Sequence, residues 1–231
     1  AENHASVSME LVSGTIREAG QRVEERWLPR GYFSVATFRE PGWRIEGKKT
    51  LGLEIAEPRK AGGAWRLPDV IVYPTGGGTG MLGMWKAFEE LEYLGLIGAD
   101  RPRMIAVQSE ATAPLVEAFD QSLEDTRAVD AGHTMAAGLN VPGGVGHFRV
   151  LEILRRSGGC ALAVSEDAMI ATLRHYYDDK GWQLCPEGAA TLAVLPELYD
   201  GGLIRSSDSV VAVNTGSLAK YIADPPDWLD R

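Results

Sequence analysis

Residues 69 to 80 read Asp69-Val-Ile-Val-Tyr-Pro74-Thr75-Gly-Gly-Gly-Thr-Gly80, and this stretch decides the fold of the chain. The β-branched run from Val70 to Val72 is typical of a buried strand. Apolar residues then recur at helical spacing, at Met81, Met84, Trp85 and Phe88. This periodicity predicts a helix that begins directly after the glycines.

Four of the five residues from Gly76 to Gly80 are glycine. Glycine adopts positive φ angles and lets the backbone approach a ligand closely. The helix N-terminus that follows adds unpaired N–H groups and a positive dipole end. The loop therefore has the elements of a phosphate site, and a tight turn that binds nothing is the alternative. It matches neither the Walker pattern, which ends in Gly-Lys-Ser/Thr, nor the spaced dinucleotide fingerprint.

The composition is that of an ordinary soluble globular protein. The chain has 231 residues, 45% hydrophobic and 24% charged, with a net charge of −9. The length allows one large domain or two small ones, and the acidic balance argues against a nucleic-acid partner or an anionic membrane surface. No apolar run approaches the roughly 18 residues of a membrane span, and the first residues lack the features of a signal peptide. We therefore expect a cytoplasmic protein.

The cysteines and histidines predict neither a disulfide framework nor a metal site. Cys160 and Cys185 are too few for such a framework and are expected to be reduced, packed side chains. The histidines show no ligand-like spacing with them: His4, His133, His147 and His175.

Strand and helix patterns alternate along the rest of the chain. Further strands are predicted at 9–12, 103–107, 160–164 and 210–213, and helices at 15–27, 50–56, 113–119, 165–177 and 188–198, with Thr15 as an N-cap. This alternation predicts an α/β fold with a mostly parallel sheet flanked by helices on both faces.

Two loops are expected at the carboxyl ends of strands, where ligands gather in such sheets. One is the glycine loop, and the other is Asn214-Thr-Gly-Ser217, so the two are predicted to face one pocket. The glycine-rich segment 131–146 is too long for a simple connection and is interpreted as an ordered loop near that pocket.

Several ordered motifs resemble those of threonine synthase and its relatives, the fold-type-II pyridoxal-phosphate (PLP) enzymes that include the serine and threonine dehydratases. The glycine loop, with Gly83-Met-Trp-Lys-Ala-Phe88, resembles the phosphate loop of that family, and the likeness extends from about Gly31 to Ile222. The other motifs are Arg44-Ile-Glu-Gly-Lys-Lys-Thr50, Met104-Ile-Ala-Val-Gln-Ser-Glu110, Pro186-Glu-Gly-Ala-Ala190 and Asn214-Thr-Gly-Ser217.

The resemblance implies roles for the matching residues. Backbone N–H groups would bind the PLP phosphate at Gly76, Gly77, Gly78, Thr79 and Gly80. Thr215 would hydrogen-bond the pyridine nitrogen. Arg44 matches an arginine that contacts the substrate phosphate in some members, through a bidentate fork. The alternatives are an ordinary turn hydroxyl at Thr215 and a surface salt bridge at Arg44.

The lysine that carries PLP in this family is expected upstream of the glycine loop, and this chain has no matching motif. Its lysines are Lys48, Lys49, Lys60, Lys86, Lys180 and Lys220, and none lies in the family context. We therefore predict no catalytic residue here, non-covalent PLP binding and no activity of the chain alone. The resemblance implies a small-domain remnant in residues 1–50 and the C-terminal part of an incomplete PLP-binding large domain in residues 51–231.

The resemblance implies that the chain is the PLP-binding part of a threonine synthase-like lyase. Such an enzyme forms threonine from O-phosphohomoserine in amino-acid metabolism. A truncated sheet would leave an open edge, so we expect a homo-oligomer or pairing with a missing N-terminal half. Two alternatives stay open. One is a dehydratase-type relative acting on an unphosphorylated amino acid, and the other is a non-catalytic module that binds a phosphorylated small molecule or a protein.

Overall fold

Strand β1 (Val70–Pro74) is an interior strand of the sheet and is buried along its whole length. The computed structural model describes residues 7–35, 43–144 and 146–221. Within it, the chain passes from β1 through Thr75 to Gly78 directly into helix α3 (Thr79–Tyr93). The predicted unit of strand, glycine loop and helix is confirmed.

In the described residues, four strands form one parallel sheet in the order β3-β2-β1-β4. The other strands are β2 (Arg103–Ser109), β3 (Cys160–Val164) and β4 (Val210–Ala212). Val72 pairs with Ile105 of β2 on one side and with Ala212 of β4 on the other. Because the strands are parallel, their carboxyl ends lie at the same edge of the sheet. The predicted α/β fold with a parallel sheet is confirmed.

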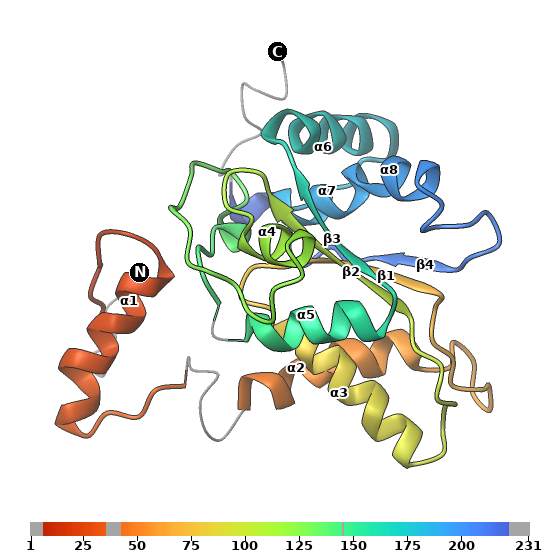
Figure 1. Cartoon of the computed structure of the whole chain (residues 1–231), viewed down its shortest axis with the longest axis horizontal. Helices are drawn as coiled ribbons and strands as arrows, with labels where there is room; N and C mark the ends of the chain where they lie inside the picture. The colour runs from red at the N-terminus through yellow and green to blue at the C-terminus, as the bar shows by residue number, and fades with distance from the viewer. Residues whose placement is uncertain (1–6, 36–42, 145, 222–231) are drawn as a thin grey trace. The chain divides into compact units, whose positions relative to one another are not determined.

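Helices cover both faces of this sheet (Figure 1). One face carries α2 (Trp43–Ala56), α3, α4 (Pro114–Asp120) and α5 (His147–Arg156), and the other carries α6 (Glu166–Lys180), α7 (Pro186–Ala193) and α8 (Leu195–Asp200). Phe88 of α3 and Leu151 of α5 belong to the first core, and Met169 of α6 and Ala190 of α7 belong to the second. Each face thus has its own apolar core, which explains the continuous apolar runs of the interior strands.

The N-terminal part of the chain is helical. By internal contacts the chain divides into Ala1–Thr37 and Phe38–Arg231. The first unit contains α1 (Ile16–Arg22), a π-helical turn at Val23–Trp27 and a 3₁₀ turn at Leu28–Arg30. Thr15 caps α1 through a capping box with Glu18, which confirms the predicted N-cap.

Some of the predicted elements are wrong. Residues 9–12 form no strand, because Met9 and Leu11 are exposed and a short strand is not stable without a partner. The helix predicted from residue 50 begins earlier and already includes Trp43. The division expected between residues 50 and 51 stays a prediction. The helix predicted over 188–198 is divided into α7 and α8, since Pro196 lacks the N–H that would continue α7. Helix α5 has no counterpart among the predicted elements.

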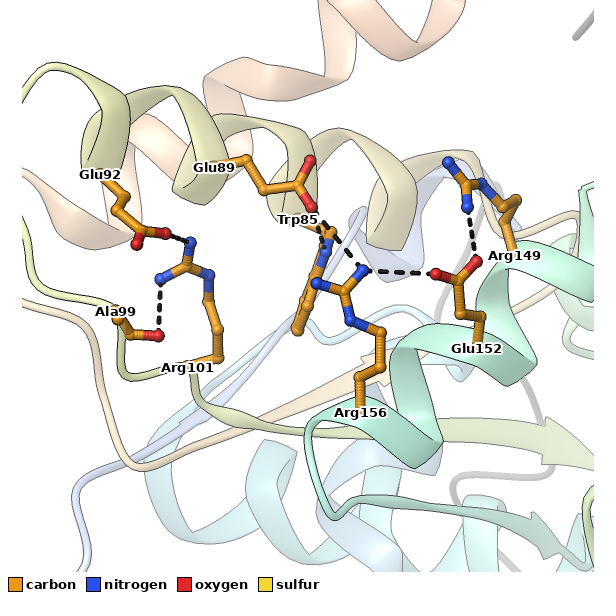
Figure 2. A network of polar contacts seen from close by, with 8 residues as sticks. All are labelled: Trp85, Glu89, Glu92, Ala99, Arg101, Arg149, Glu152 and Arg156. Carbon is orange, nitrogen blue, oxygen red and sulfur yellow. Dashed lines mark hydrogen bonds and ion pairs between the residues drawn. The ribbon is translucent and has the colours of Figure 1, made fainter.

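A network of aromatic and charged side chains joins α3 to α5 (Figure 2). Trp85 donates from Nε1 to Oε1 of Glu89 at 2.9 Å. The guanidinium carbons of Arg101 and Arg156 lie 5.9 and 5.4 Å from the centroid of this ring. Arg156 also pairs with Glu152 of its own helix at 3.3 Å. Each cation–π contact is worth about 0.5–1 kcal/mol at a partly exposed site, so the network reinforces the outer side of the first core.

Helices α2 and α3 approach each other closely at two glycines. A Cβ on Gly83 would lie 2.5 Å from Cβ of Lys48 and 2.6 Å from its carbonyl carbon. A Cβ on Gly52 would lie 2.9 Å from Cα of Met84. These neighbours are backbone atoms or Cβ atoms, which are unable to move independently. The close contact between α2 and α3 therefore requires glycine at both positions.

We expect Gly83→Ala to destabilise the protein by about 1–3 kcal/mol, because the added methyl forces the two helices apart. Gly47→Ala is the matched control: it lies in α2, where a Cβ would meet no atom within 4 Å. That substitution should stabilise by up to about 1 kcal/mol through helix propensity. Urea unfolding midpoints of the two variants measure the difference, and equal midpoints would contradict the packing.

Candidate functional site

The glycine loop presents a run of main-chain amides that have no acceptor in the described part of the chain. Thr75 N donates to Val107 O at 2.8 Å, and Leu82 N donates to Gly78 O at 3.1 Å. Between them, the amides of Gly76 to Gly80 donate to no main-chain or side-chain acceptor among the residues that the structure describes. They lie at the N-terminus of α3, where the helix dipole favours an anion.

Side chains have no room in this loop. A Cβ on Gly76 would lie 2.2 Å from the carbonyl oxygen of Gly138, and one on Gly80 would lie 1.8 Å from the hydroxyl of Tyr73. Gly78, the N-cap of α3, has a φ of 85°. Glycine is required at this φ because L-residues with side chains rarely adopt it. These glycines therefore let the loop pack against Gly138 and Tyr73 more closely than residues with side chains would.

His147 lies against the loop as the first residue of α5 and is completely buried. Its Nε2 lies 2.8 Å from Gly76 O, and its Nδ1 lies 3.1 Å from Gly144 N and 3.0 Å from Thr126 Oγ1. Burial lowers the pKa of His147, although the bond to Gly76 and the charge of Asp125 act in the opposite direction. The neutral ring is therefore favoured inside the protein.

A buried carboxylate supports the segment 131–146, which contacts the glycine loop through Gly138. Oε1 of Glu187 accepts from Gly138 N at 2.8 Å and from the hydroxyl of Tyr221 at 2.7 Å. Glu187 is 4% exposed, and its Oε2 has no hydrogen-bond partner among the described residues. Burial raises the pKa of Tyr221, and the adjacent carboxylate raises it further, so this hydroxyl stays protonated and donates.

The loop after β4 is held by the N-terminus of α7. Asn214 Oδ1 accepts from Cys185 N at 3.1 Å and from Cys185 Sγ at 3.2 Å. Thr215 Oγ1 lies 3.8 Å from the same sulfur. Burial raises the pKa of Cys185, which keeps it a thiol. Because β4 pairs with β1, this loop and the glycine loop follow the carboxyl ends of neighbouring strands.

The remaining candidate residues lie on other elements. Arg44 lies in the first turn of α2, the helix that packs against α3. Lys49 pairs with Glu90 at 2.7 Å, and Lys86 pairs with Glu46, so both amines are engaged between α2 and α3. Lys220 is different. Its Cδ lies 3.9 Å from the position of a Cβ on Gly216, beside the Thr215 loop.

Sequence reasoning assigned no role to the side chains that support the glycine loop. His147 was considered only as a metal ligand, and no pattern in the sequence links it to Gly76, 71 residues away. Glu187 lies within the family motif Pro186-Glu-Gly-Ala-Ala190, and this is the signal in the sequence that points to a role for it. In the described residues, no group of three or more His, Cys, Asp or Glu side chains could hold a metal ion. The arrangement is suited to an anion at the glycine loop and a polar group near Thr215.

We expect the stability of the protein to fall as the pH drops below about 6.5, the ordinary pKa of histidine, because His147 is neutral when folded. Its pKa is lowered in the folded state, so the unfolded chain binds more protons in this window. The contribution is complete above the unfolded pKa and is lost as the pH falls through the folded pKa. Thermal unfolding midpoints from pH 7.5 to 5 should fall more steeply for the parent than for His147→Gln. Parallel profiles for the parent and His147→Gln would contradict a role of His147 in the pH dependence of stability. His175→Gln, at an exposed histidine of α6, is the control for loss of a histidine.

Comparison with known proteins identifies the family. The family model described as "Pyridoxal-phosphate dependent enzyme" matches residues 5–216. Threonine synthase of Methanosarcina acetivorans is 30% identical over 188 residues, covering 81% of this chain and 44% of that protein. Threonine synthase of Methanocaldococcus jannaschii is 28% identical over 174 residues, covering 75% of this chain and 42% of that protein. The chain thus spans less than half the length of these relatives.

Solved structures agree on the fold. The processed form of threonine deaminase isoform 2 from Solanum lycopersicum superposes with a TM-score of 0.67 at 20% identity, covering 92% of this chain and 57% of that one. At this identity the likeness concerns the fold alone, which is the fold of the type-II PLP enzymes. Together with the family match, it follows that this chain belongs to the pyridoxal-phosphate-dependent enzyme family and is similar to its threonine synthases.

Proposed function

We propose that this chain binds PLP as the cofactor-binding part of a threonine synthase-like lyase. The observation that carries the proposal is the run of amides from Gly76 to Gly80 at the N-terminus of α3, which donate to no acceptor within residues 7–35, 43–144 and 146–221. Buried or half-buried donors without partners are costly, and a phosphate satisfies several of them at once. The relatives named threonine synthase support the choice of this phosphate ligand.

The residues present fit the cofactor at both ends. The glycine loop offers amides and no side chains where a phosphate would sit, and the Thr215 hydroxyl can donate to or accept from a ring nitrogen. A neutral hydroxyl there does not force protonation of that nitrogen as a carboxylate would. When bound, PLP supplies an electron sink for negative charge at the substrate carbons. The role of this chain is to hold the phosphate at the glycine loop and to orient the ring through Thr215.

For the substrate we propose O-phosphohomoserine, with Arg44 as the contact to its phosphate. A guanidinium forms two parallel hydrogen bonds to a phosphate, which suits the role. A dehydratase-type relative would act on an unphosphorylated hydroxyl amino acid and would not need such an arginine. Replacement of Arg44 by alanine therefore distinguishes the two substrates once activity is available.

Activity itself requires a lysine amine that we do not assign to this chain. We propose that the chain alone is inactive, that a second polypeptide carrying this lysine completes the site, and that the chain also associates with a second copy of itself. Strand β4 supports pairing of this kind: in the described sheet it pairs on one side only, and its three residues are half-buried. A cytoplasmic location is proposed as well; within the described residues, no helix is long and apolar enough to cross a membrane.

A non-catalytic phosphate-binding module is the second candidate. The observation that favours it is the phosphate cradle, the name we give to the amides of Gly76 to Gly80. Amides do not distinguish the phosphate of PLP from other phosphate esters. PLP that binds no more tightly than pyridoxine phosphate or inorganic phosphate would favour this module, whereas preference for PLP would favour the enzyme part.

We expect PLP to bind the purified chain and Gly78→Ala to weaken binding at least about tenfold, or about 1.4 kcal/mol. The added methyl would sit at a φ of 85° and lie 2.5 Å from Val150 Cγ2, which distorts the cradle. Gly158→Ala is the matched control, with a φ of 64° but no atom within 4 Å of its Cβ. Titration by fluorescence quenching measures both affinities. Equal affinities for the two variants would contradict binding of PLP at the glycine loop.

Borohydride treatment of the PLP complex tests the non-covalent mode. We expect mass spectrometry to find no reduced adduct at any lysine, because the amines of Lys49 and Lys86 are engaged in ion pairs. Lys220 is the position to inspect first, since its side chain lies beside the Thr215 loop. A stoichiometric adduct there, lost in Lys220→Arg, would overturn the non-covalent assignment.

We expect Thr215→Val to reduce PLP affinity by about three- to tenfold, the equivalent of one hydrogen bond, and to shift the absorbance maximum of the bound cofactor. Binding of inorganic phosphate should be unchanged, because the glycine loop is intact. The two titrations share one protein preparation, and a parallel loss of phosphate binding would mean that Thr215 acts only on folding.

A further inference from the structure

We propose that His147 is a positioning residue that holds the peptide unit between Gly76 and Gly77 in the orientation needed for anion binding. This inference rests on the proposed phosphate site and assigns it a residue outside the motifs. The hydrogen bond from Nε2 of His147 to Gly76 O is 2.8 Å long, and the ring has no exposed surface. His147 therefore acts through the loop and not on a ligand in solvent.

The partners of the ring define its tautomer. Gly144 N is a donor only and lies 3.1 Å from Nδ1, so Nδ1 must be the acceptor. The hydroxyl of Thr126, 3.0 Å from the same nitrogen, can donate to it as well. Nε2 then carries the proton and donates to Gly76 O, which can only accept. The neutral ring with its proton on Nε2 is compatible with all three contacts, and the two donors share the single lone pair of Nδ1.

Because the peptide bond is planar, the hydrogen bond from His147 to Gly76 O also fixes the direction of Gly77 N–H. In a trans peptide the carbonyl oxygen of one residue and the N–H of the next point to opposite sides. Holding Gly76 O toward His147 therefore turns Gly77 N–H away from His147, toward the side where that amide has no protein acceptor. Flanking glycines would otherwise let this peptide rotate, because they have little torsional preference.

Packing of Gly138 against Gly76 also limits the freedom of the loop. The carbonyl oxygen of Gly138 lies against Cα of Gly76, only 2.2 Å from where a Cβ would be. Gly76 thus contacts both the His147 ring and the 131–146 segment. Two elements that are distant in sequence from the glycines set the direction of the amides that the glycines expose.

Two substitutions separate the hydrogen bond from the volume of the ring. In His147→Gln the side-chain NH₂ can reach the position of Nε2 and donate to Gly76 O, whereas in His147→Asn the amide ends near Nδ1 and is too short. We expect His147→Asn to weaken binding of PLP and of inorganic phosphate at least about tenfold and His147→Gln to stay within about threefold of the parent. His175→Asn, at an exposed histidine of α6, is the control and should change neither affinity.

Readouts other than affinity keep the test independent of folding and of the proposed function. NMR order parameters of the Gly77 and Gly78 amides should be lower in His147→Asn than in His147→Gln at matched free energies of unfolding. Nitrogen chemical shifts of the parent ring should identify a proton on Nε2. Equal losses of affinity that follow unfolding midpoints, or a proton on Nδ1, would overturn the positioning role. Failure of the parent to bind PLP or phosphate would instead reject the proposed function, and order parameters and nitrogen shifts would still decide the role of His147.

Discussion

Tight packing of the glycine loop between β1 and α3 is the constraint on which the site depends. Methyl groups at Gly76 or Gly80 would overlap with Gly138 or Tyr73, so the chain turns from strand to helix in a space that larger residues would not fit. Among the residues that the structure describes, the amides of Gly76 to Gly80 at the N-terminus of α3 have no acceptor. An anion is the partner that best satisfies such amides, since helix dipole and hydrogen bonding act together. Fold and candidate function thus share one physical origin.

A loop of glycines is intrinsically mobile, and the surrounding structure restricts it. His147 contacts the loop from α5, and Gly138 contacts it from the 131–146 segment. Gly138 is itself held by Glu187, which in turn accepts from Tyr221 near the end of the described chain. These contacts join residues separated by up to 71 positions in sequence. A site made of backbone is therefore ordered by buried side chains that do not belong to it.

Glycine serves two separate purposes in this protein. Gly52 and Gly83 allow α2 and α3 to approach, which is a matter of packing and stability. Gly76, Gly78 and Gly80 expose amides, which is a matter of binding. One glycine of each group, Gly80 and Gly83, lies in the first turns of α3, so sequence alone does not separate them. The distinction comes from the atoms that a Cβ would meet: the backbone of a neighbouring helix for Gly83 and the walls of the loop for Gly76 and Gly80.

Local periodicity and glycine content were sufficient to predict the parallel α/β fold, the unit of β1, glycine loop and α3, and the loop after β4. Its motifs also identified the family. Sequence patterns misjudged residues 9–12, where apolar residues lack a partner strand, and they missed α5 entirely. Only the tertiary structure placed His147 on Gly76 and Glu187 on Gly138, since these hydrogen bonds form between segments that no periodicity connects. Local physics decides which backbone can bind an anion, and long-range packing decides in which direction its amides point.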